Sequence, residues 1–203
     1  MTTPRLRSAD RSLEAAVAAL RAGEVVSVAT DTVYGLVCDP ADAAAVDRVY
    51  VLKRRPADLE LTLLAADAAD LRGLVEWTQP ALALADAFWP GPLSLVLSVA
   101  ERRLAVPRYG STLAVRIPDH AHLRELLRRS GPLASTSANR HGDPPATSAA
   151  AVRRRFGVEV AVVLWGGRPG GMASTIIDCS VTPPRVLRDG PIDGNRLRGF
   201  LQG

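Results

Sequence analysis

Lys53 and Arg55, in the stretch KRRP, form a cation pair that could bind an anion. Lys53 is the only lysine among the 25 lysine and arginine residues, and it falls on the same helical stripe as the apolar Val46 and Val49. Pro56 disfavours helical backbone at Arg55, so we expect the helix to end there and both cations to turn toward one phosphate-like anion. The structural alternative is a lysine that lies along apolar surface with its ammonium in water.

Two segments with small polar side chains lie at the ends of predicted strands. They are residues 29–36, with Thr30, Asp31 and Thr32, and residues 132–148, with Ser135, Thr136, Ser137 and Asn139. In open α/β sheets, ligands bind beyond the carboxyl ends of the strands, which makes these hydroxyl and amide groups candidate ligand contacts. The same residue types also cap helices and form ordinary turns.

The glycine-rich segment WGGRPGGMAST, residues 165–175, lies between two predicted strands. It lacks the ending of a P-loop and the spacing of a dinucleotide fingerprint, so residues 165–171 are either a cover over a site or a long connection. No Gly-x-Ser-x-Gly elbow is present, and His120, His122 and His141 have no partners at zinc-site spacing. We therefore expect no protein-held metal and a reaction that depends on binding and positioning.

The elements that position these residues alternate along the chain. Helices are predicted over residues 11–23, 41–54, 68–77, 80–89, 119–131, 147–157 and 193–201, and strands over residues 24–29, 61–65, 93–99, 112–118, 132–136, 160–165 and 174–180. This interleaving predicts an α/β fold with a twisted, mostly parallel or mixed sheet flanked by helices. Without an internal repeat or linker, we expect a single domain over residues 1–203.

Composition limits the partners and the cellular location. The net charge of +4 and pI of about 9.7 reflect arginine clusters at residues 102–103, 128–129 and 153–155, which are either solvated helix faces or a surface for phosphates or RNA. Aromatic residues are too sparse for a base-stacking platform. No signal peptide or membrane span is predicted, and Cys38 and Cys179 are expected to be buried thiols. We expect a cytoplasmic protein that does not contact membranes.

Seven stretches in register resemble the threonylcarbamoyl-AMP synthase family, the YrdC-like proteins. They are TDTVYGL, the Lys-x-Arg of KRRP, FWPGPLSLVL, AVRIP, TSAN, STIID and VLRDG. The resemblance runs from about residue 10 to residue 192. It implies a YrdC-like fold with a large, concave, basic face. The implied reaction joins L-threonine, bicarbonate and ATP, with Mg²⁺, into threonylcarbamoyladenylate and pyrophosphate. The adenylate would go to a downstream transferase that modifies tRNA.

The resemblance also implies roles for individual residues. ATP would be held by Lys53, Arg55, Thr112, Ser137, Asn139 and Arg188, with Lys53 and Arg55 as the catalytic cations. Threonine would be held by Thr32, Arg116, Ser135 and Ser174. A point-like ammonium and guanidinium forks suit the charge that develops on phosphoryl oxygens, and the Arg116 guanidinium suits a carboxylate.

Several positions differ from the family pattern, Leu64 and Leu59 among them, and two other functions remain open. Leu64 stands where many members have a threonine-contacting histidine, and Leu59 aligns with an ATP-contacting asparagine. The first alternative is a divergent paralogue that uses another amine or carbamoyl donor. The second is a non-catalytic module that binds tRNA or double-stranded RNA, for which salt-sensitive binding would not depend on Lys53.

Overall fold

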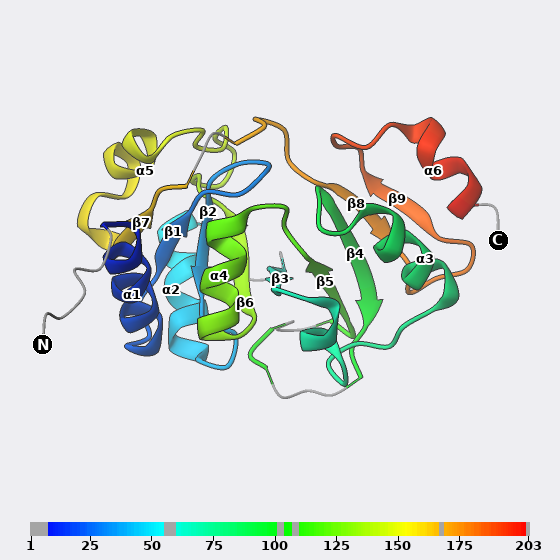
Figure 1. Cartoon of the computed structure of the whole chain (residues 1–203), viewed down its shortest axis with the longest axis horizontal. Helices are drawn as coiled ribbons and strands as arrows, with labels where there is room; N and C mark the ends of the chain where they lie inside the picture. The colour runs from blue at the N-terminus through cyan, green and yellow to red at the C-terminus, as the bar shows by residue number, and fades with distance from the viewer. Residues whose placement is uncertain (1–7, 55–59, 101–103, 107–109, 167–168, 202–203) are drawn as a thin grey trace, which may run out of the picture.

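One nine-stranded sheet forms the centre of the protein in the computed structural model, which describes residues 8–54, 60–100, 104–106, 110–166 and 169–201. The strands are β1 (Val26–Val28), β2 (Gly35–Cys38), β3 (Thr62–Leu64), β4 (Leu93–Ser98), β5 (Thr112–Arg116), β6 (Leu133–Ser137), β7 (Val162–Leu164), β8 (Thr175–Asp178) and β9 (Arg185–Arg188). Their order across the sheet is β7-β1-β2-β6-β3-β5-β4-β8-β9 (Figure 1).

Six α-helices and two short 3-10 helices flank the described part of this sheet (Figure 1). They are α1 (Ser8–Arg21), α2 (Ala43–Lys53), η1 (Ala68–Leu71), α3 (Gln79–Phe88), α4 (Ala121–Ser130), α5 (Ala149–Phe156), η2 (Gly157–Glu159) and α6 (Gly194–Leu201). Side chains of Asp42, Thr78, His120 and Ser148 accept hydrogen bonds from backbone amides at the starts of α2, α3, α4 and α5. These caps satisfy donors that have no partner within the helix.

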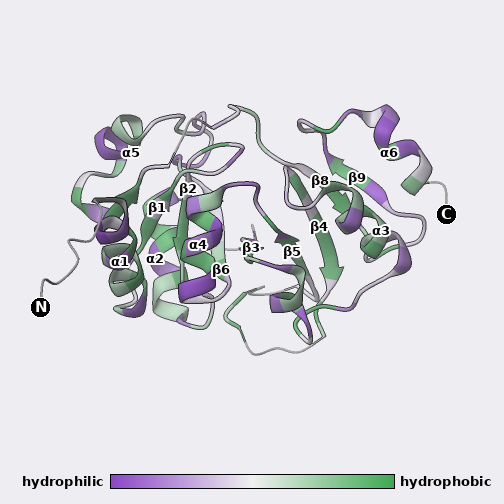
Figure 2. Cartoon of the chain, in the orientation of Figure 1, coloured by the Kyte–Doolittle hydropathy of each residue, from purple (hydrophilic) through white to green (hydrophobic). Residues whose placement is uncertain are grey.

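The two faces of the sheet are covered differently. One hydrophobic cluster joins α2, α3, α5 and α6 to one face through strand residues such as Leu36, Leu63, Val115 and Ile177. The other cluster joins α1 and α4 to the opposite face through Val26, Val28 and Val37. Figure 2 shows mostly hydrophobic residues along the central strands and both hydrophilic and hydrophobic residues along the helices, as expected where one helix face meets a core.

The predicted α/β class and mixed sheet are confirmed. The pairs β1–β7, β3–β5 and β4–β8 are parallel, and the other five pairs are antiparallel, so the sheet is mixed rather than mostly parallel. None of the described helices is both long and apolar enough to cross a membrane.

Three elements differ from the sequence prediction. Strands β2 and β9 were not predicted, because β2 has only four residues and all four residues of β9 are exposed, which removes the alternating pattern of a half-buried strand. The predicted helix over residues 68–77 is wrong beyond η1. Its backbone becomes extended at Arg72 and left-handed at Gly73, with φ of 72°, and a left-handed residue ends a helix.

Candidate active site

A cavity of about 270 Å³ lies on the sheet face that carries α1 and α4, over strands that these two helices leave uncovered. Strand pairing arranges its floor in two rows, because paired residues on neighbouring strands point to the same side. One row runs across β3, β5, β4, β8 and β9 and contains Leu64, Arg116, Ser94, Ile176 and Arg188. The next row contains Ser135, Thr62, Ala114 and Val96.

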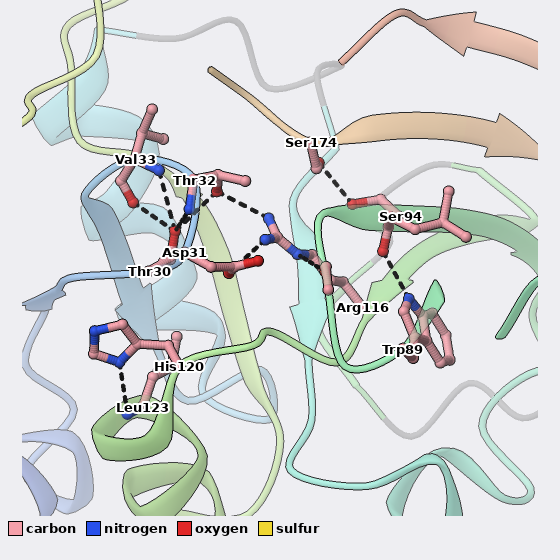
Figure 3. Close-up of polar contacts among 12 residues, drawn as sticks. Thr30, Asp31, Thr32, Val33, Trp89, Ser94, Arg116, His120, Leu123 and Ser174 are labelled. Carbon is pink, nitrogen blue, oxygen red and sulfur yellow. Dashed lines mark hydrogen bonds and ion pairs between the residues drawn. The ribbon is translucent and has the colours of Figure 1, made fainter. Parts of the chain in front are cut away.

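The Arg116 guanidinium is held at three points on the cavity wall (Figure 3). Its Nε donates to the Gly91 carbonyl at 2.9 Å, Nη1 donates to Thr32 Oγ1 at 3.0 Å, and Nη2 donates to Asp31 Oδ1 at 2.6 Å. A Cβ at Gly91 would overlap the carbonyl of Phe88, so glycine is required there. Burial lowers the pKa of Arg116, while the charge of Asp31 and its hydrogen bond oppose that shift.

Thr30 organises the segment that supplies Thr32. Its Oγ1 donates to the Val33 carbonyl at 2.7 Å and accepts from the backbone amides of Thr32 and Val33. The hydroxyl oxygens of Thr30 and Thr32 lie 2.8 Å apart. The oxygen of Thr32 accepts from Arg116.

Ser174 and Arg188 form the opposite wall of the cavity. Ser174 Oγ lies 2.9 Å from Ser94 Oγ (Figure 3) and accepts from Arg188 Nη2 at 3.0 Å, while the Ser174 carbonyl accepts from Arg188 Nε at 2.9 Å. Partial burial of the guanidinium, and then the charge of Arg116, lower the pKa of Arg188. Two cationic groups that repel each other therefore face the same cavity, which favours an anionic ligand.

Lys53 lies behind the cavity wall and is 1% exposed. Its Nζ donates to the carbonyls of Ser137 and Asn139 at 2.6 and 2.8 Å and to Asn139 Oδ1 at 3.0 Å. Ser137 Oγ, whose residue lines the cavity, donates to the same Oδ1 at 2.5 Å. The ammonium is therefore linked to the cavity through the turn formed by residues 137–139.

Six of the ten residues predicted from the sequence line this cavity, namely Thr32, Arg116, Ser135, Ser137, Ser174 and Arg188. Asn139 and Lys53 lie directly behind Ser137. Thr112 is on the same side of β5 as Arg116 but at the other end of the strand, and it is not among the lining residues. Arg55, Pro56 and Leu59 lie outside the described residues.

Residues 169–175 of the glycine-rich segment lie beside the cavity. The amides of Gly170 and Gly171 donate to the carbonyls of Asp31 and Thr32 at 3.1 and 2.7 Å, and Ala173 and Ser174 line the cavity. Within the described residues, no group of three or more His, Cys, Asp or Glu side chains could hold a metal ion.

A second cavity, of about 700 Å³, has a more apolar lining that includes Trp77, Leu82, Trp89 and Ile117. None of the described residues predicted as site residues lines it. Arg116 and Ile117 are adjacent on the chain and serve different cavities. The polar cavity is therefore the candidate site although it is the smaller one.

Sequence reasoning did not assign site roles to Asp31, Ser94, Thr62 or Gly91. Asp31 was part of a candidate loop, but its partner Arg116 is 85 residues away. Ser94 and Thr62 sit on strands in which alternate residues face the cavity, so alternation within LSLVLS and LTLL was the available signal.

Comparison with known proteins identifies the family. A family model that covers the Sua5, YciO and YrdC proteins, described as telomere recombination, matches residues 18–190. The chain belongs to this family.

The curated relatives agree in their names. Threonylcarbamoyl-AMP synthase of Chromohalobacter salexigens is 43% identical over 84% of this chain and 94% of its own length. Threonylcarbamoyl-AMP synthase of Bacillus subtilis is 36% identical over 98% of this chain, which spans 59% of that relative. The chain therefore matches nearly all of one relative and a little over half of the other.

Solved structures of the Sua5/YciO/YrdC family share the fold. Pyrococcus abyssi Sua5, in a complex with L-threonine, superposes with a TM-score of 0.88 at 35% identity over 98% of this chain and 59% of that chain. Escherichia coli YciO superposes with a TM-score of 0.84 at 26% identity over 98% of this chain and 96% of its own. The YrdC-like fold expected from the sequence is thus confirmed.

Proposed function

We propose that this protein joins L-threonine, bicarbonate and ATP into threonylcarbamoyladenylate, releasing pyrophosphate and water. Similarity over 84% and 98% of this chain to relatives named threonylcarbamoyl-AMP synthase carries this proposal. The cavity supports it, because paired arginines and small hydroxyl side chains suit two anionic reactants held side by side. The adenylate would pass to a downstream transferase that modifies tRNA, and direct contact with tRNA is part of the proposal.

The amino-acid end lies at the row that contains Arg116. The guanidinium accepts the threonine carboxylate, with Thr32, Ser135 and Ser174 around it. Leu64, paired with Arg116 across β3 and β5, offers apolar surface where a polar contact was expected from the family. Threonine held this way presents its amine for reaction with bicarbonate to form a carbamate.

The nucleotide end lies toward Ser137 and Arg188. Asn139 and Lys53 stabilise the Ser137 turn from behind, and Arg55 and Thr112 complete the proposed ATP contacts. The carbamate attacks the α-phosphorus of ATP, and pyrophosphate leaves. Charge develops on the phosphoryl and pyrophosphate oxygens, so the cations and the Mg²⁺ that enters with ATP lower the barrier.

Pyrophosphate release measured with ATP, Mg²⁺, bicarbonate and L-threonine tests the function. We expect release to require threonine and to fall at least about 100-fold in Arg188→Ala and in Lys53→Ala. Equal release with serine or other amines would favour the divergent paralogue. ATP binding without release would contradict both catalytic functions, and salt-sensitive RNA binding independent of Lys53 would then indicate the RNA-binding module.

A further inference from the structure

Asp31 is a partly buried acid that lies behind the cavity wall. Its Oδ1 accepts from Arg116 Nη2 at 2.6 Å, and the side chains of Asp31 and Arg116 are 15% and 7% exposed. Arg116 and Thr32 line the cavity, whereas Asp31 is not among its lining residues. Figure 3 shows the Asp31 carboxylate beside the guanidinium. Asp31 can therefore act on a ligand through Arg116.

The contacts of Arg116 leave a defined pair of donors. A guanidinium has five N–H groups, and the bonds to Gly91, Thr32 and Asp31 use three of them. Five minus three leaves two, one on Nη1 and one on Nη2, without an acceptor among the described residues. A carboxylate accepts two parallel N–H bonds from a guanidinium. The orientation of the Arg116 guanidinium plane therefore decides whether these two N–H groups face the cavity.

Asp31 is the only charged group among these three anchors. Thr32 and Gly91 offer neutral oxygens, and charge-assisted hydrogen bonds are about twice as strong as neutral ones. Arg188 is three strands away from Arg116 in the sheet order, about 14 Å between backbones, and its positive charge acts on Arg116 from across the cavity. Without Asp31, that repulsion has no opposing charge next to the guanidinium.

The position of Asp31 is itself fixed by backbone contacts. Its carbonyl accepts from Gly170, and the neighbouring Thr32 carbonyl accepts from Gly171. Asp31 Oδ2 is buried and has no hydrogen-bond partner among the described residues. An asparagine would place either its NH₂ group at that site without an acceptor or its NH₂ group against Arg116. Asparagine is therefore a poor replacement.

We propose that Asp31 is a positioning residue for amino-acid recognition, which holds Arg116 so that two N–H groups face the α-carboxylate of the substrate. The proposal rests on the proposed function, because it takes an amino acid as the ligand of Arg116. It adds a residue that does not touch the substrate and sets the affinity for one reactant.

Calorimetric binding of L-threonine and of ATP to the free protein tests this role, with steady-state pyrophosphate release as a second measurement. We expect Asp31→Ala to raise the Kd and KM for threonine about 10- to 100-fold, with the ATP affinity within twofold and kcat within a few fold. L-Threoninol, which lacks the carboxylate, should bind equally to both proteins. In an Arg116→Lys background, Asp31→Ala should cause no further loss.

Glu125→Ala is the matched control, because Glu125 also pairs with arginines but lies on α4 away from the cavity. It should leave all these values unchanged. Unchanged threonine affinity in Asp31→Ala would overturn the proposal, as would an equal loss for threonine and ATP with a lowered Tm, which indicates a merely structural role. If the wild-type protein binds no threonine, the proposed function fails first and this proposal fails with it.

Discussion

The geometry around Lys53 explains why this position has a lysine, although the other 24 of the 25 lysine and arginine residues are arginines. Three oxygens, from Ser137 and Asn139, surround its Nζ at 2.6 to 3.0 Å. An ammonium is a compact charge with three donors, whereas a guanidinium is planar and spreads its donors along a fork. Only the ammonium matches three acceptors that converge on one point in a buried space.

Substitution of Lys53 should therefore be costly even when the charge is kept. We expect Lys53→Arg and Lys53→Met each to reduce threonine-dependent pyrophosphate release by at least about 10-fold. Each should also lower the free energy of unfolding by about 1–3 kcal/mol, since buried acceptors lose their donor. Denaturant unfolding and steady-state release measure the two effects.

Arg54→Gln provides the control for Lys53, because Arg54 is the adjacent cation and is exposed. Its activity should remain close to that of the wild type. Wild-type activity and stability in Lys53→Arg would show that a point-like ammonium is not required at this position.

At the scale of the element, the protonation state of His120 decides whether it can cap the start of helix α4. Its Nδ1 accepts from the Leu123 amide at 3.2 Å, which caps the helix (Figure 3) and requires an unprotonated Nδ1. Burial is the largest cause that lowers the pKa of His120, and His122 lowers it further. The Gly166 backbone, Asp31 and Asp119 oppose the shift. A proton would also place positive charge at the positive end of the helix dipole.

The lowered pKa fixes the sign of a pH dependence. The unfolded chain binds a proton at His120 near pH 6.5, whereas the folded protein resists it to lower pH. This contribution to stability is therefore complete above about pH 6.5 and is lost as the pH falls through the lower folded-state pKa. Denaturant unfolding from pH 8 to pH 5 should show a loss of about 1 kcal/mol from this cap.

Asparagine separates this effect from other titrations, because it caps helices and does not titrate. His120→Asn should lose less stability than the wild type between pH 7 and pH 5. His141→Asn, at an exposed position that is not among the groups acting on His120, should follow the wild type. If the free energy of unfolding falls equally with pH in the wild type and in His120→Asn, His120 is not the source of the pH-dependent loss of stability.

Local patterns predicted the elements that have a strong period and failed where tertiary contacts decide. Apolar spacing predicts helix α1, and alternation predicts strand β5. Strand β9 is an edge strand of four exposed residues, so it has no alternation of buried and exposed positions from which to predict it. The same limit applies to the site. Ser135 and Ser137 could be identified because they are at the end of a predicted strand. The bond from Lys53 to Ser137 joins residues 84 positions apart, and no spacing rule encodes it.

At the scale of the whole molecule, the cavity is lined by residues from two parts of the sheet, and α1 and α4 cover only one of these parts. Thr32 and Ser135 belong to the end of the sheet that α1 and α4 cover, while Ser174 and Arg188 belong to the β8–β9 end. On the strands between them, Arg116 contacts Thr32 at one end and Ser94 contacts Ser174 at the other. A ligand that fills this cavity therefore bonds to both ends of one sheet.

Threonine should consequently protect two distant segments from hydrogen exchange at once. We expect the amides of residues 30–33 and of residues 174–176 to exchange more slowly, by up to about 100-fold at a threonine concentration of 100 Kd. Helix α5, whose residues do not line the cavity, serves as the internal reference and should not change. Mass spectrometry of peptides from these three regions measures the effect. Protection of one segment alone would mean that threonine binds to one wall and that the two ends of the sheet are not coupled through it.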